Sequence, residues 1–144
     1  MTNRINGIRV SAKRHRILEA EAFESFLRME TRRAIRSRKS LVLLLLDVPS
    51  TSEVSPVGDV SPVLDRLSSS VRATDYIGWR ESGKRLGILF TEVDSDRDED
   101  IAKLLSAKIA RLVSERLDVG FAEQPTATVL PSGRSYVFVP TGTA

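Results

Sequence analysis

The sequence has no cysteine and a single histidine among its 144 residues. Without cysteine the chain forms no disulfide, and it has no thiol nucleophile and no thiolate metal ligand. The lone histidine, His15, lies in a basic run near the N-terminus and excludes a site built from several histidines. A disulfide-stapled fold, a thiol enzyme and a histidine-rich metal centre are therefore excluded, and we expect no cofactor.

Long hydrophobic runs are also missing. The longest apolar run, Leu41–Leu46, has six residues, whereas a helix needs about 20 to cross a bilayer. The N-terminus is basic but has no apolar signal core, so neither a membrane span nor export is indicated. We therefore expect a cytoplasmic domain.

The formal net charge of +3 is unevenly distributed along the chain. Residues 1–40 contain 11 basic and 4 acidic residues, a net +7, and residues 41–144 contain 11 and 15, a net −4. A basic front end can attract nucleic acid or an anionic membrane surface. A solvated helix face behind a polar tail also accounts for this charge, and it is the favoured interpretation.

Hydrophobic spacing predicts the first elements. Residues 1–15 are polar without a sustained period and are predicted to be a tail. Phe23, Phe26 and Leu27 recur at helical spacing, which predicts a helix over residues 17–38. The run Leu41–Leu46 is short, continuously apolar and followed by Asp47, which predicts a strand buried on both faces in the middle of a sheet.

The remaining segments predict a hairpin between helices. A loop over residues 48–61 precedes a helix over 62–71, and Gly83 lies in the turn of a predicted β-hairpin. The acidic residues 94–100 open a helix that extends to 117. The predicted strands cover residues 75–80, 86–91, 126–130 and 136–139. Because helices and strands do not alternate regularly, we expect an α+β domain over residues 16–144. Its central sheet is mostly antiparallel, with helices packed over it.

Several of these segments resemble the GGDEF domain of diguanylate cyclases, a bacterial family with the nucleotidyl cyclase fold. In the first helix and strand the resemblance rests on Phe23, Leu27, Glu30, Arg33, Ala34, Arg36 and Asp47. It continues in the motif Arg72-x-x-Asp75, which is followed after five residues by a hairpin in the place of the family signature. Together these positions span about residues 20–115.

The resemblance implies that active members hold a metal ion and GTP between two acidic positions. Asp47 retains the first of these positions. The signature itself is replaced by Glu81, Ser82, Gly83, Lys84 and Arg85. No acid stands at its fourth or fifth place, and its paired glycines are gone. The resemblance therefore predicts a degenerate domain that is not an enzyme. Alternatively, Lys84, Arg85 and the glycine turn hold a phosphate, although a solvated hairpin tip is favoured.

The motif Arg72-x-x-Asp75 matches the inhibitory site at which the family binds cyclic di-GMP. Arginine can clamp a phosphate or a guanine edge with two parallel hydrogen bonds, and the aspartate can accept from guanine N–H groups. The alternative interpretation is structural: Arg72 favours the end of a helix dipole and Asp75 caps a turn.

These observations favour a non-catalytic signalling or scaffold domain that contacts a protein partner or a second copy and optionally binds cyclic di-GMP. The alternative is a nucleic-acid-binding or protein-interaction module that uses the basic N-terminal region. Nucleic acid is less favoured, because the arginines are spread around a helix and no base-reading motif is present. An enzyme of other chemistry using Asp47 and Asp59 ranks lowest, since no nucleophile–base pair is visible.

Overall fold

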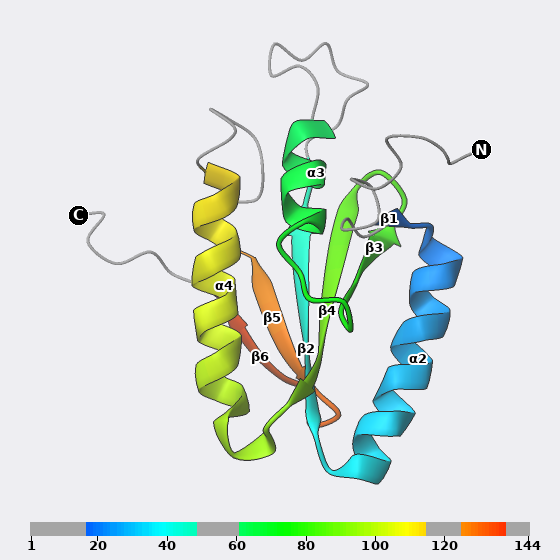
Figure 1. Ribbon diagram of the computed structural model, residues 1–144, viewed down its shortest axis with the longest axis vertical. Helices are drawn as coiled ribbons and strands as arrows, with labels where there is room; N and C mark the ends of the chain where they lie inside the picture. The colour runs from blue at the N-terminus through cyan, green and yellow to red at the C-terminus, as the bar shows by residue number, and fades with distance from the viewer. Residues whose placement is uncertain (1–16, 49–60, 115–124, 138–144) are drawn as a thin grey trace.

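The computed structural model describes residues 17–48, 61–114 and 125–137, which form one sheet with helices on both faces (Figure 1). In chain order, the elements are β1 (Ile17–Leu18), α2 (Ala20–Ser37), β2 (Ser40–Asp47), α3 (Ser61–Ser68), β3 (Tyr76–Glu81), β4 (Arg85–Val93), the 3-10 turn η1 (Ser95–Arg97), α4 (Asp98–Ser114), β5 (Thr126–Leu130) and β6 (Arg134–Val137). None of the helices in these ranges is long and apolar enough to cross a membrane.

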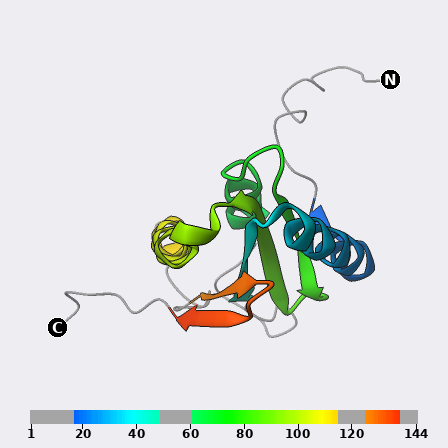
Figure 2. The ribbon, with the colours of Figure 1, turned by 90° about the horizontal axis from the view of Figure 1, so that it is seen from below.

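The strand order is β1-β3-β4-β2-β5-β6. All neighbouring strands pair antiparallel except β1 and β3, which run parallel. The prediction of a mostly antiparallel sheet in an α+β fold is therefore confirmed. Figure 2, seen from below, shows α2 and α4 well separated, with the strands between them.

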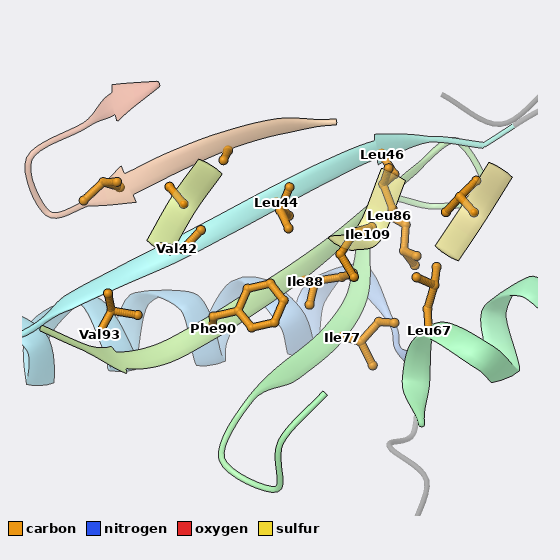
Figure 3. Packing of buried hydrophobic residues seen from close by; sticks show 14 of the residues in the cluster. Val42, Leu44, Leu46, Leu67, Ile77, Leu86, Ile88, Phe90, Val93 and Ile109 are labelled. Carbon is orange, nitrogen blue, oxygen red and sulfur yellow. The ribbon is translucent and has the colours of Figure 1, made fainter. Parts of the chain in front are cut away.

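Strand β2 lies in the middle of the sheet and is buried on both faces, as predicted. Val42, Leu44 and Leu46 belong to the larger core cluster, where Figure 3 shows them with Ile88 and Ile109. Leu41 and Leu43 point to the other face and join a smaller cluster beneath α2. Because each buried leucine contributes about 1.5–3 kcal/mol, this strand anchors both layers.

Helix α2 packs its Phe23 onto a pair of glycines. Gly78 in β3 and Gly87 in β4 are directly opposite each other in the register. A Cβ at Gly78 would lie 2.8 Å from the Phe23 ring, and one at Gly87 would lie 2.9 Å from it. Such distances are shorter than real contacts, so the absence of side chains at this pair allows the ring to approach the sheet.

Two predicted helices are shorter than expected. Ile17 and Leu18 do not begin α2 but form a strand that pairs with Ile77 and Gly78 of β3, a long-range contact that overrides the helical pattern. Helix α3 ends at Ser68 instead of residue 71, because the hydroxyl of Ser70 donates a 2.7 Å hydrogen bond back to a backbone carbonyl of the helix.

The other predicted elements are present with small shifts. The hairpin β3–β4 turns at Gly83, whose φ of 71° confirms the predicted turn. Trp79 is half-buried and Phe90 is 5% exposed, so both are sheet and core residues as expected. The predicted tail over residues 1–15, most of the loop around Asp59 and residues 115–117 and 138–139 lie outside the described residues.

Candidate functional site

The carboxylate of Asp75 is buried and joins the α3–β3 connection to β4. The backbone N–H of Arg72 and its Nε donate to Oδ2 at 2.9 and 3.2 Å, and its Nη2 donates to Oδ1 at 3.1 Å. The backbone N–H of Thr91 also donates to Oδ1, at 3.0 Å. Because the Asp75 side chain has no exposed surface, this arrangement matches the turn-capping interpretation.

Arg72 is held along one edge of its guanidinium and exposed along the other. Its Nη2 donates both to Asp75 and to the backbone carbonyl of Thr91. The side chain is nevertheless 59% exposed, and Nη1 makes no hydrogen bond within the described ranges. The site therefore presents an oriented cation to solvent, and Asp75 supplies the orientation.

A second polar pair, in which Glu30 is buried and Tyr76 is half-buried, lies next to this motif. Tyr76 donates a 2.8 Å hydrogen bond from its hydroxyl to Oε2 of Glu30, and its ring stacks on Phe26 with centroids 4.8 Å apart. Burial, followed by this hydrogen bond and the negative charge of Glu30, raises the pKa of Tyr76 to about 12. The phenol therefore stays neutral at physiological pH and fixes one face of α2 to β3.

The β3–β4 hairpin meets the end of β2. Asp47 and Glu81 both pair in register with Arg85, so Arg85 lies between the two acids. Arg85 Nε donates to Oδ1 of Asp47 at 3.1 Å. The N–H of Val48 donates to the carbonyl of Lys84 at 2.8 Å, which extends the β2–β4 pairing as far as the turn.

These residues do not fit a metal ion. The Asp47 carboxylate, 71% exposed, is already paired with a cation. No group of three or more histidine, cysteine, aspartate or glutamate side chains that could hold a metal occurs in the part of the chain that the structure describes. Ser82 and Gly83 complete the exposed tip of the hairpin, and Asp59 lies outside the described residues.

The structure does not bring the two predicted sites together. Asp75 immediately precedes β3 and Glu81 ends it, so Figure 1 shows the α3–β3 connection and the hairpin tip at opposite ends of that strand. Arg72 and Asp75 form one site, and Asp47 with the hairpin forms another.

A polar network at the start of α4 was not predicted from the sequence. Asp98 is 6% exposed and accepts hydrogen bonds from Ser40 at 2.9 Å and from Nη2 of Arg134 at 3.0 Å. Three separate elements meet there. The only signal in the sequence is the acidic opening of the helix over residues 94–100, which the helix dipole alone also explains.

Comparisons with known proteins give a structural likeness without a sequence match. No protein-family model matches the chain, and no curated protein matches it. The GGDEF domain of TpbB (YfiN) from Pseudomonas aeruginosa superposes over 81% of this chain and 73% of its own, with a TM-score of 0.62 and 18% identity. A diguanylate cyclase protein from Thermotoga maritima covers 82% and 85%, with a TM-score of 0.59 and 15% identity.

A third structure is the diguanylate cyclase SiaD of Pseudomonas aeruginosa in complex with its activator SiaC. It covers 87% of this chain and 49% of its own, with a TM-score of 0.53 and 16% identity. The prediction that the chain is not an enzyme is contradicted by this comparison, because the matched structures are those of diguanylate cyclases and their GGDEF domain. The chain has the fold of a GGDEF domain.

Proposed function

We propose that this chain is a signalling domain of the GGDEF type that binds cyclic di-GMP through Arg72, with Asp75 as the residue that positions Arg72. The observation that carries the proposal is the Arg72 side chain, which is 59% exposed although Asp75 fixes one edge of its guanidinium. Cyclic di-GMP offers phosphates and guanine edges, and both accept paired hydrogen bonds from arginine.

The geometry changes the role expected for Asp75. Its two oxygens already accept four hydrogen bonds inside the domain, so the proposal does not require it to contact guanine. By holding Arg72 in place, Asp75 reduces the side-chain entropy that binding would otherwise remove. We further propose that the domain contacts a protein partner or a second copy of itself in the cytoplasm. The protein partner is supported by the activator complex of one protein with this fold.

Isothermal titration with cyclic di-GMP tests this function. We expect Arg72→Ala to weaken binding by about 10- to 100-fold, the usual effect of losing charge-assisted hydrogen bonds. Arg72→Lys should restore only part of the affinity, because an ammonium cannot form the paired bonds. The matched control is Arg66→Ala, which removes an exposed arginine from the preceding helix and should leave binding unchanged.

Two outcomes would contradict the proposal: no heat with cyclic di-GMP, or equal losses in Arg72→Ala and Arg66→Ala. Because the fold points to an enzyme family, the same preparations should also be incubated with GTP and Mg²⁺, and any cyclic di-GMP formed measured by chromatography. Product formed by the wild type would show that the domain makes the ligand as well as binding it.

A further inference from the structure

The outward face of α2 carries an unusual density of positive charge. Between residues 28 and 39 the basic residues are Arg28, Arg32, Arg33, Arg36, Arg38 and Lys39, and the only acidic residue, Glu30, is buried. Arg28, Arg32 and Arg36 follow one another at intervals of four residues. They therefore form one row along the exposed face of the helix, called here the arginine row.

Within the described residues the arginine row makes one ion pair, between Arg28 and Glu24 one turn earlier on the same helix, at 3.2 Å. Helix α2 packs on the sheet through its opposite face, with Phe23, Leu27 and Ala34 buried. Arg32 and Arg36 form no ion pair with any residue in the described ranges. Like charges one turn apart oppose helix formation, and the helix dipole favours positive charge only in the last turn, which contains Arg36 and not Arg28. Arg32 and Arg36 are therefore not explained by the stability of the fold, and the row points to an anionic partner.

Exposed apolar side chains lie within the same surface. Met29 is 38% exposed and Ile35 is 58% exposed, and they are two of the four large hydrophobic residues exposed in the described part of the chain. Met29 and Ile35 lie three residues from Arg32, and the two other arginines of the row lie four residues from it. On a helix these spacings make all four residues surface neighbours of Arg32. This face therefore combines phosphate-binding cations with apolar side chains.

We propose that the arginine row, together with Met29 and Ile35, binds the surface of an anionic phospholipid bilayer. The guanidinium groups pair with headgroup phosphates, and the two apolar side chains enter the interfacial region, as in other surface-lying helices. A nucleic-acid duplex offers phosphates but no apolar phase for Ile35, so a lipid surface satisfies more of this face. Helix α2 then lies along the membrane, with α3 and α4 on the far side of the sheet.

Co-sedimentation of the full chain with vesicles tests the proposal. Vesicles of phosphatidylglycerol and phosphatidylcholine should bind the protein, those of phosphatidylcholine alone should not, and binding should fall as salt rises. Each basic residue near such a surface strengthens binding about fivefold, so Arg32→Glu with Arg36→Glu should weaken it by about 25-fold or more. Ile35→Ser, which keeps the charge, should weaken it several-fold.

The matched control is Arg66→Glu with Lys108→Glu, which makes the same change of charge at exposed positions of α3 and α4 and should bind as the wild type does. The milder pair Arg32→Gln and Arg36→Gln repeats the test if charge reversal disturbs folding. Equal binding to neutral vesicles, equal losses in the control, or an Ile35→Ser variant that binds normally would each overturn the lipid assignment. So would a gel shift of duplex DNA without vesicle binding, which would assign the row to nucleic acid.

Discussion

At the scale of single residues, the polar groups of the core are held by partners at very different distances along the chain. The pairing of Arg72 with Asp75 was visible because the two lie within one short motif. The contact between Tyr76 and Glu30 spans 46 residues, and no local pattern reports a partner so distant. Asp75 shows the same limit, because the donor from Thr91 that completes its site comes from another strand.

The half-buried phenol of Tyr76 predicts a loss of stability in alkali. Its folded-state pKa is raised to about 12 from an unfolded value of about 10. Below about pH 10 the phenol is protonated in both states, so its contribution is fully present. As pH rises from about 10 to about 12, only the unfolded state releases the proton, and stability falls.

Urea unfolding of the wild type and of Tyr76→Phe at about pH 8 and about pH 11 checks this expectation. At the lower pH the variant should be less stable by about 1–2 kcal/mol, because the buried Glu30 loses a hydrogen-bond donor. At the higher pH the difference should shrink. Parallel losses in both proteins would show that other groups cause the alkaline decline.

At the scale of elements, the helices and strands that could be predicted are those determined by residues close together in the sequence. Strand β2 and helix α4 follow from continuous or periodic apolar residues, and the hairpin β3–β4 follows from a glycine turn, so all three were predicted from the sequence. Strand β1 exists only because it pairs with β3, and α3 is ended early by a serine hydroxyl. Both of these boundaries depend on contacts that hydrophobic spacing does not encode.

The end of α2 offers a test of a backbone effect. Arg38 adopts the left-handed conformation with a φ of 61°, and the backbone N–H of the cap accordingly returns to the carbonyl of Ala34. Glycine takes up this conformation without the clash that a Cβ causes. Arg38→Gly should therefore be more stable than Arg38→Ala by about 1 kcal/mol, measured by thermal unfolding.

Arg36, in the last turn of the same helix, provides the matched control. There alanine should exceed glycine by about 0.5–1 kcal/mol, the ordinary helical preference. Because both comparisons remove the same charge, differences between alanine and glycine report the backbone alone. The same order of stability at both positions would contradict the assigned role of the left-handed cap.

At the scale of the whole molecule, Asp98 connects three parts of the chain. Its carboxylate accepts from Ser40 of β2 and from Arg134 of β6, and it begins α4. Asp98→Ala should lower the free energy of unfolding by about 2–3 kcal/mol, since a buried residue and two hydrogen bonds to a charged group are lost. Amide hydrogen exchange should accelerate in β6 more than in β3.

Asp100→Ala is the control for Asp98→Ala. It removes an exposed acid from the first turn of the same helix, so both variants lose a similar interaction with the helix dipole, and the control should lose less than about 1 kcal/mol. If both variants unfold at the same urea concentration, the connection through Asp98 carries no stability of its own.

The leucine-rich sequence of β2 has a consequence for the register in which this strand pairs with its neighbours. Between Ser40 and Asp47, strand β2 consists of five leucines and one valine, and both of its faces are apolar. If the strand slid along its neighbours, one leucine would replace another. The apolar interior of the strand therefore specifies its register only weakly. The register is specified at the polar ends of the strand, where Ser40 donates a hydrogen bond to Asp98 and Asp47 accepts one from Arg85. The register of this central strand is therefore set at its two ends, by its two polar residues.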